Sequence, residues 1–134
     1  MRIARSLVDE IVAHAREDAP NECCGMIAAR NGSAVRVHRI RNQDASPLRY
    51  TLDPMQQFEV EEAIEEAGHR VGAIYHSHTR SAPYPSQTDI TLASPLYAES
   101  LYVIVGVAAP EADVRAFRIL DGQVSESPLE VVEE

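Results

Sequence analysis

The sequence has no lysine, and its 12 basic residues are outnumbered by 21 acidic ones, which gives a formal net charge of −9 at pH 7. Nucleic-acid binding needs clustered Lys and Arg that neutralise phosphates. The composition therefore argues against a general nucleic-acid partner. It does not choose between protein partners, although a partner with a basic face would associate faster with such a chain.

Cysteine is scarce as well, and the two cysteines of the chain are the adjacent Cys23 and Cys24. Adjacent residues of a strand point to opposite faces, so a disulfide between them is not expected. We expect two small, buried strand residues in a reducing compartment rather than a redox or metal pair.

Long apolar runs are absent as well, since no stretch approaches the roughly 20 residues of a membrane span. The N-terminus lacks the basic start and small-residue cleavage site of a signal peptide. We therefore expect a soluble, cytoplasmic protein with no membrane partner. With 134 residues, 45% of them hydrophobic, and no repeat or linker, residues 1–134 should form one domain.

Periodicity and turn signals predict a mixed order of helices and strands. Apolar residues at helical spacing predict a first helix over 6–18, with Ser6 as its cap, and Asp53 caps a second helix that ends at Gly68. Strands are expected over 23–29, 34–40, 71–78, 101–107, 114–120 and 124–131, with hairpin turns at Asn31-Gly32 and Asp121-Gly122. A short helix is expected over 86–94. The glutamates of the second helix should form a solvated face.

The run from His76 to Asp89 concentrates side chains that bind metals. His76 and His78 continue a β-rich stretch and should point to one face, with Cα atoms roughly 6.5–7 Å apart. That separation lets two imidazoles converge on one ion at about 2.0–2.1 Å. Ser86-Gln87-Thr88-Asp89 has the form of a capping box, which places Asp89 in a first helical turn.

Two histidines and one carboxylate are the ligand count of a catalytic zinc site with a fourth position open to water. Structural zinc is usually closed by four ligands, mostly cysteines. An isolated His-x-His is common on ordinary strands, but the Asp and Ser at this spacing favour metal binding. The same ligand set also suits other first-row ions.

The pattern His-x-His, seven residues, Ser, two residues, Asp, with Glu22 upstream beside a Cys-Gly pair, resembles the JAMM (MPN+) zinc metalloproteases. The resemblance implies an α/β fold, with a curved mixed β-sheet flanked by helices, similar to cytidine deaminases. It also implies one zinc ion per chain, held by His76, His78 and Asp89. Glu22, expected at the beginning of a strand, would be the general base, and Ser86 would stabilise the oxyanion.

Within that family, residues 75–79, 84–86 and 118–122 are similar to small actinobacterial peptidases. Those enzymes remove cysteine from the C-terminus of a ubiquitin-like sulfur carrier protein. The resemblance implies hydrolysis after the carrier's C-terminal Gly-Gly, with release of cysteine for cysteine biosynthesis, and leaves a homodimer open. The tail would lie extended along a strand edge, with 41–50 and 80–85 as walls of the groove. Thr79 stands where many deubiquitinating members carry proline.

Several alternatives stay open. An isopeptidase would use the same site to remove ubiquitin-like modifiers from lysines. A non-catalytic MPN interaction module should lack one or more of the five motif residues, and all five are present. A structural zinc with Cys23 or Cys24 as fourth ligand would leave Glu22 without a task. Ser77 receives no catalytic role, and His14, His38 and His69 are expected to be surface or structural residues.

Overall fold

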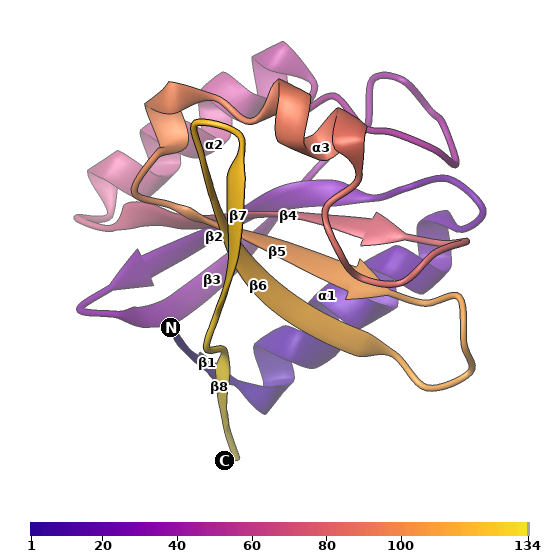
Figure 1. Ribbon diagram of the computed structural model, residues 1–134. Coiled ribbons are helices and arrows are strands. Elements are labelled where there is room, and N and C mark those ends of the chain that lie inside the picture. Colours follow the sequence, from indigo (N-terminus) through magenta and orange to yellow (C-terminus); the bar gives the residue numbers. More distant parts are fainter. Residues whose placement is uncertain (134) are drawn as a thin grey trace.

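The computed structural model describes residues 1–133, which form one mixed sheet with helices on both faces (Figure 1). The elements are β1 (Arg2–Ala4), α1 (Arg5–Asp18), β2 (Cys24–Arg30), β3 (Ser33–Ile40), α2 (Pro54–Glu66), β4 (Arg70–His78), α3 (Gln87–Leu92), the 3₁₀ turn η1 (Pro95–Tyr97), β5 (Leu101–Gly106), β6 (Asp113–Leu120), β7 (Gln123–Ser127) and β8 (Glu130–Val132). The strand order is β7-β6-β5-β4-β2-β3-β1-β8. The β4–β5 pair is parallel and the β2–β4 pair is antiparallel, so the sheet is mixed, as expected.

The two edge strands of the sheet, β7 and β8, are neighbours along the chain (Figure 1). We expected one strand over 124–131, and this was wrong, because the pairing is interrupted at Pro128. Proline cannot donate to a ladder. Ser127 pairs with Ala116 of β6, whereas Glu130 pairs with Arg2 of β1. One bent segment of the chain therefore supplies both edge strands of the sheet.

Each face of the sheet has its own apolar core. On one face Val8 and Ile11 of α1 pack in a cluster that includes Cys23. The other face contains Cys24 and packs against Ile64 of α2. Both thiols are free and buried, on opposite faces as expected, and burial raises the pKa of Cys23 to about 12. Such thiols are poor metal ligands and nucleophiles.

Local sequence signals set the ends of α2 but not the start of α1. Asp53 caps α2 by accepting from the backbone N–H groups of Met55 and Gln56, as its sequence predicts. The helix ends at Glu66, and Gly68 follows with φ of +75°. The first helix begins at Arg5 rather than after Ser6, because β1 leads straight into it and Ala4 is its N-cap residue. Neither β1 nor η1 was expected.

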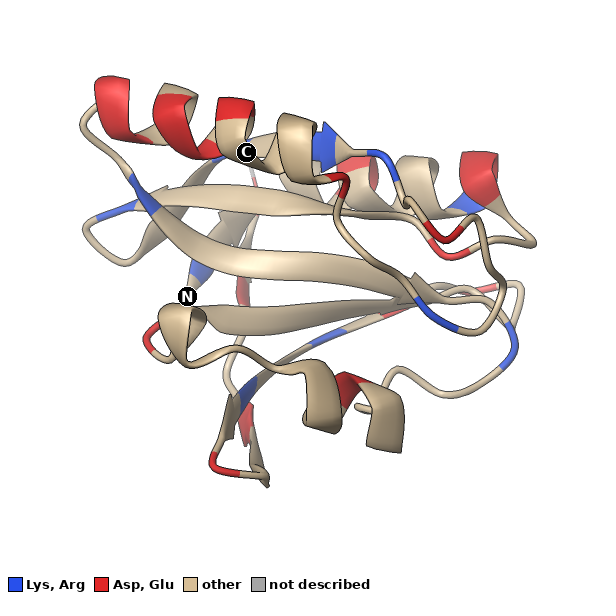
Figure 2. Cartoon of the chain, turned by 90° about the horizontal axis from the view of Figure 1, so that it is seen from above, with Lys and Arg blue, Asp and Glu red and all other residues tan. Residues whose placement is uncertain are grey.

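The acidic residues of α2 lie along the outer side of the molecule (Figure 2). Glu59, Glu62, Glu65 and Glu66 are exposed. Glu61 is half-buried and accepts a hydrogen bond from the Tyr97 hydroxyl at 3.0 Å. The solvated face predicted for this helix is therefore confirmed. No helix within residues 1–133 is long and apolar enough to span a membrane.

Candidate metal and catalytic site

Three ligand atoms meet at the end of β4. The Nε2 atoms of His76 and His78 are 3.2 Å apart, and Oδ2 of Asp89 lies 3.2 Å from the first and 3.1 Å from the second. Ligands bound tetrahedrally at 2.0–2.1 Å from one ion are about 3.3–3.4 Å apart. The triad therefore fits a single small divalent cation. It is also the one such cluster of His, Cys, Asp and Glu found in residues 1–133.

The two histidines are fixed because β4 is paired on both sides, with β2 and β5. Their positions two residues apart place both rings on one face, as expected. Asp89 reaches them through the predicted capping box. Its N–H donates to Ser86 Oγ at 3.0 Å, and its Oδ2 accepts from the Ser86 N–H at 2.9 Å. The hydrogen bond from the Ser86 N–H holds the Asp89 carboxylate towards the end of β4.

A backbone carbonyl sets the tautomer of His78. Its Nδ1 lies 2.8 Å from the carbonyl oxygen of Ala82, which can only accept, so Nδ1 carries the proton and Nε2 keeps its lone pair for a metal. Gly106 of β5 supports this loop. A Cβ atom there would lie 2.8 Å from Cδ of Pro83, so any larger residue would displace the loop that carries the Ala82 carbonyl.

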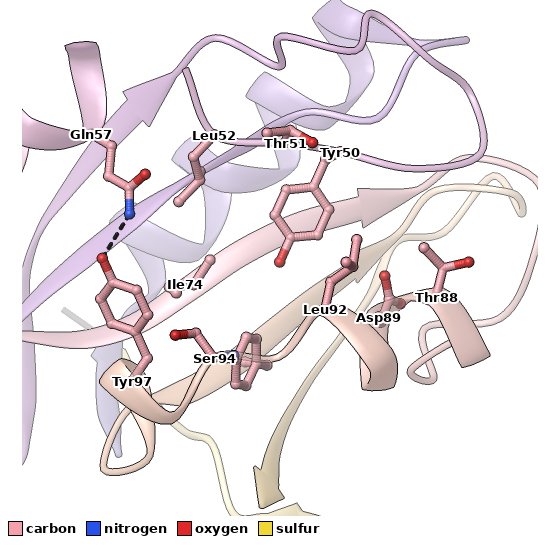
Figure 3. A pocket seen from close by; sticks show the side chains of 11 residues that line it. Tyr50, Thr51, Leu52, Gln57, Ile74, Thr88, Asp89, Leu92, Ser94 and Tyr97 are labelled. Atoms are coloured by element: carbon pink, nitrogen blue, oxygen red, sulfur yellow. Dashed lines mark hydrogen bonds between the residues drawn. The ribbon is translucent and has the colours of Figure 1, made fainter. Parts of the chain in front are cut away.

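Tyr50 covers His76, with ring centroids 4.4 Å apart and planes 21° from parallel. Burial lowers the pKa of His76, which keeps the ring in the neutral form that metal binding needs. Beside this stack is a pocket of about 280 Å³. Figure 3 shows Tyr50 on one side of this pocket and Asp89 and Leu92 of α3 on the other.

Glu22 is the second buried feature of the site. Its side chain is 4% exposed, and within residues 1–133 its Oε1 has no hydrogen-bond partner. Burial raises the pKa of Glu22 to about 7. The charge of His78 opposes this shift, and the charge of Asp89 adds to it. Burying an unpartnered carboxylate oxygen is costly, and carboxyl groups of this kind are typical of functional sites.

We expected Glu22 at the beginning of a strand, but it lies two residues before β2, which begins at Cys24. The Glu22 N–H donates to the Ser46 carbonyl at 2.8 Å instead of to a strand.

Ser77 joins Cys23, the residue after Glu22, to β4, the strand that carries the two histidines. Its Oγ accepts from the Cys23 N–H at 2.8 Å, and its N–H donates to the Cys23 carbonyl at 3.1 Å.

Ser77 thus links the Glu22 segment to the strand that carries the histidines, a role that the sequence analysis missed. Its buried position on the opposite side of the strand from the ligands agrees with the prediction that it is not catalytic. His14 is structural, as expected, because its Nδ1 contacts the Tyr75 hydroxyl at 2.7 Å inside the protein.

The raised pKa of Glu22 has a consequence for stability. A carboxyl whose pKa rises from 4.5 to about 7 on folding contributes stability that is complete below about pH 4.5 and lost as the pH rises through about 7. We therefore expect Glu22→Gln to stabilise the metal-free protein above pH 7, by about 2 kcal/mol after allowance for solvent screening.

Thermal unfolding with chelator present, at pH 5 and pH 8, measures this effect. Glu59→Gln, on the exposed side of α2, is the control and should unfold like the wild type at both pH values. If Glu22→Gln is no more stable relative to the wild type at pH 8 than at pH 5, the raised pKa assigned to Glu22 is contradicted.

Comparison with known proteins decides the family. The model of the prokaryotic homologues of the JAB domain matches residues 4–120. The chain belongs to this family. It is 42% identical over 135 residues to the CysO-cysteine peptidase of Mycobacterium tuberculosis, covering 98% of this chain and 91% of that protein.

Two further relatives of this JAB-family chain come from other groups of organisms. The desampylase of Haloferax volcanii is 39% identical, over 70% of this chain and 73% of its own length. A probable TtuB-protein conjugate cleaving protease of Thermus thermophilus is 36% identical, over 90% of this chain and 77% of its own length.

Solved structures agree on the fold. A Desulfitobacterium hafniense protein matches with a TM-score of 0.88 and 30% identity, over 100% of this chain and 94% of that one. A structure described as a JAMM metalloprotease-like zinc site matches with a TM-score of 0.63 and 21% identity, over 99% of this chain and 98% of that one. The expected JAMM/MPN fold is therefore confirmed. The relatives named as a peptidase and a protease, taken together with this fold, confirm the expected metallopeptidase class.

Proposed function

We propose that the protein is a zinc-dependent peptidase that hydrolyses the bond after the C-terminal Gly-Gly of a ubiquitin-like sulfur carrier protein and releases cysteine. The observation that supports it most is the convergence of His76 Nε2, His78 Nε2 and Asp89 Oδ2 near the buried, unpartnered Glu22. One zinc ion per chain fits this triad. Three protein ligands leave a fourth coordination position open, as in catalytic zinc sites. The buried thiols of Cys23 and Cys24 are unsuited to fill that position.

Each residue of the site has a separate task. When bound, zinc supplies a Lewis acid that polarises the scissile carbonyl and lowers the pKa of water towards about 7. Glu22 takes the proton of the attacking water and passes it to the leaving amine. Ser86 Oγ already accepts from the Asp89 N–H, so its own O–H can donate to the oxyanion. His76, His78 and Asp89 would hold the ion in place.

The choice of cysteine as leaving group is supported by the 42% identity with the mycobacterial CysO-cysteine peptidase, which extends over nearly the whole chain. The relatives named as a desampylase and as a conjugate cleaving protease support a second candidate, an isopeptidase that removes a ubiquitin-like modifier from lysine. Both candidates use the same residues and differ in the leaving amine. A homodimer and a cytoplasmic location stay predictions.

Intact mass separates the two candidates. A Gly-Gly-tailed carrier that bears a C-terminal cysteine, and the same carrier linked to a lysine side chain, are incubated with zinc-loaded protein, with Glu22→Gln as control. We expect the first to lose the mass of one cysteine residue much faster than the second. Faster cleavage of the lysine adduct would favour the isopeptidase, and an unchanged mass of both would reject the proposal.

Ser86 allows a test of the oxyanion role. We expect Ser86→Ala to lower kcat by about 100-fold, because a lost oxyanion donor costs about that much, and to lower stability by about 1 kcal/mol through the lost cap. Ser86→Thr keeps both the hydroxyl and the cap and should restore both properties. Assays run well below the unfolding transition separate the two effects, and an unchanged kcat in Ser86→Ala would leave Ser86 as a helix cap alone.

A further inference from the structure

The loop between β3 and α2 is organised around one buried side chain, Asn42, which is 8% exposed. Its Nδ2 donates to the carbonyl oxygens of Glu22, at 3.0 Å, and Arg49, at 3.1 Å. Its Oδ1 accepts from the backbone N–H groups of Asp44, at 3.0 Å, and Thr51, at 3.1 Å. The carboxamide therefore has a partner for both N–H groups and both lone pairs.

The same loop reaches two different parts of the site. On one side its Ser46 carbonyl accepts from the N–H of Glu22, so both backbone polar groups of Glu22 bond to this loop. On the other side its Tyr50 stacks on the metal ligand His76. Asn42 lies at the start of the loop and bonds to both its far end and the Glu22 peptide.

We propose that Asn42 is a positioning residue for the peptidase reaction, whose carboxamide locks the loop to the Glu22 peptide and so fixes Glu22 relative to the Tyr50–His76 stack. The inference rests on the proposed function. Asn42 contacts the Glu22 backbone, not its carboxylate, and it acts through Glu22 and Tyr50. Positioning of this kind matters because a shift of about 1 Å in a catalytic group can cost about 100-fold in rate.

Asn42→Asp is the sharpest variant, because it keeps the shape of the side chain and the acceptor oxygen. It replaces the two N–H donors with an oxygen that faces the carbonyls of Glu22 and Arg49, which can only accept. We expect kcat to fall by about 10- to 100-fold, with little change in KM and with the metal content of the wild type. Activity is measured on whichever adduct the wild type cleaves, and per folded, metal-loaded molecule.

Ser100→Ala is the matched control. Ser100 is also buried, and its Oγ donates to the Val71 carbonyl at 2.7 Å, at the opposite end of β4 and β5 from the ligands. Loss of this bond should lower the melting temperature and leave kcat unchanged. A purely structural role of Asn42 would give the same result as Ser100→Ala.

Hydrogen exchange of the metal-loaded protein tests the coupling without any substrate. We expect Asn42→Asp to speed amide exchange at 22–24 and at 43–51 together, and Ser100→Ala to change neither segment. A kcat within about twofold of the wild type, or faster exchange in 43–51 alone, would overturn the proposal. If the wild type cleaves neither adduct but both segments exchange faster, the proposed function fails and the locking role of Asn42 stands.

Discussion

Replacing Glu22 with glutamine should lower kcat by about 10²–10⁴-fold, the contribution expected of a general acid–base group. Glutamine has nearly the same shape and burial but cannot take a proton from water. Since Glu22 is not one of the three ligands in the triad, the variant should keep its metal. The measurement is the steady-state rate of carrier cleavage, with metal content determined on the same sample.

The activity control is again Glu59→Gln, which removes a glutamate from the exposed side of α2 and should match the wild type. A Glu22→Gln protein that retains more than about a tenth of the wild-type kcat would remove Glu22 from the mechanism. A variant that loses both its metal and its activity would instead assign Glu22 a role in metal binding.

Removing one of the three proposed metal ligands should lower activity at least as much as Glu22→Gln does. His76→Ala leaves two of the three converging ligands, and we expect metal affinity to fall by more than about 100-fold, since even supporting residues of metal sites contribute 10- to 100-fold. Activity should fall with it. Metal analysis after dialysis measures the loss, and in the wild type a chelator should abolish activity that added zinc restores.

His38→Ala is the matched control, because His38 lies on β3 outside the triad and is half-buried. It should keep both metal and activity. A His76→Ala protein with one tightly bound metal per chain would place the ion elsewhere and revive the structural alternative with Cys23 or Cys24. The raised pKa of Cys23, about 12, argues against that outcome because a metal-bound thiol must lose its proton.

The metal triad could be predicted from sequence because its geometry is local. His76 and His78 share a face through the two-residue period of a strand, and Asp89 is held by a capping box four residues long. The cap of α2 at Asp53 and the two hairpin turns were predictable for the same reason. In the hairpins, Asn31 and Asp121 adopt positive φ beside glycines, as such turns require.

Elements that depend on distant partners could not be predicted. β1 is three residues long and exists because it pairs with β3 and β8, and no local pattern indicates those partners. The break at Pro128 had a visible signal, since proline inside a strand pattern argues against a continuous strand. The role proposed for Glu22 comes from resemblance to a family, because a single Glu before a strand carries no signal by itself.

The supporting residues of the site were missed for the same physical reason. Ser77, Tyr50 and Asn42 act through contacts with segments 20 or more residues away, such as the 2.8 Å bond between Cys23 and Ser77. Asn42 lies in an irregular loop, where neither periodicity nor composition indicates which way a side chain points. Spacing thus predicted the three side chains that converge at the end of β4 but not the contacts of Ser77, Tyr50 and Asn42 around them.

Cleavage of the carrier–cysteine adduct in heavy-oxygen water tests the central claim most directly. Water attack predicts one heavy oxygen atom in the new C-terminal carboxylate of the carrier, together with one free cysteine. The labelled product should require metal and should be nearly absent with Glu22→Gln. Release of cysteine without the label, or no cleavage by fully zinc-loaded protein, would contradict the account.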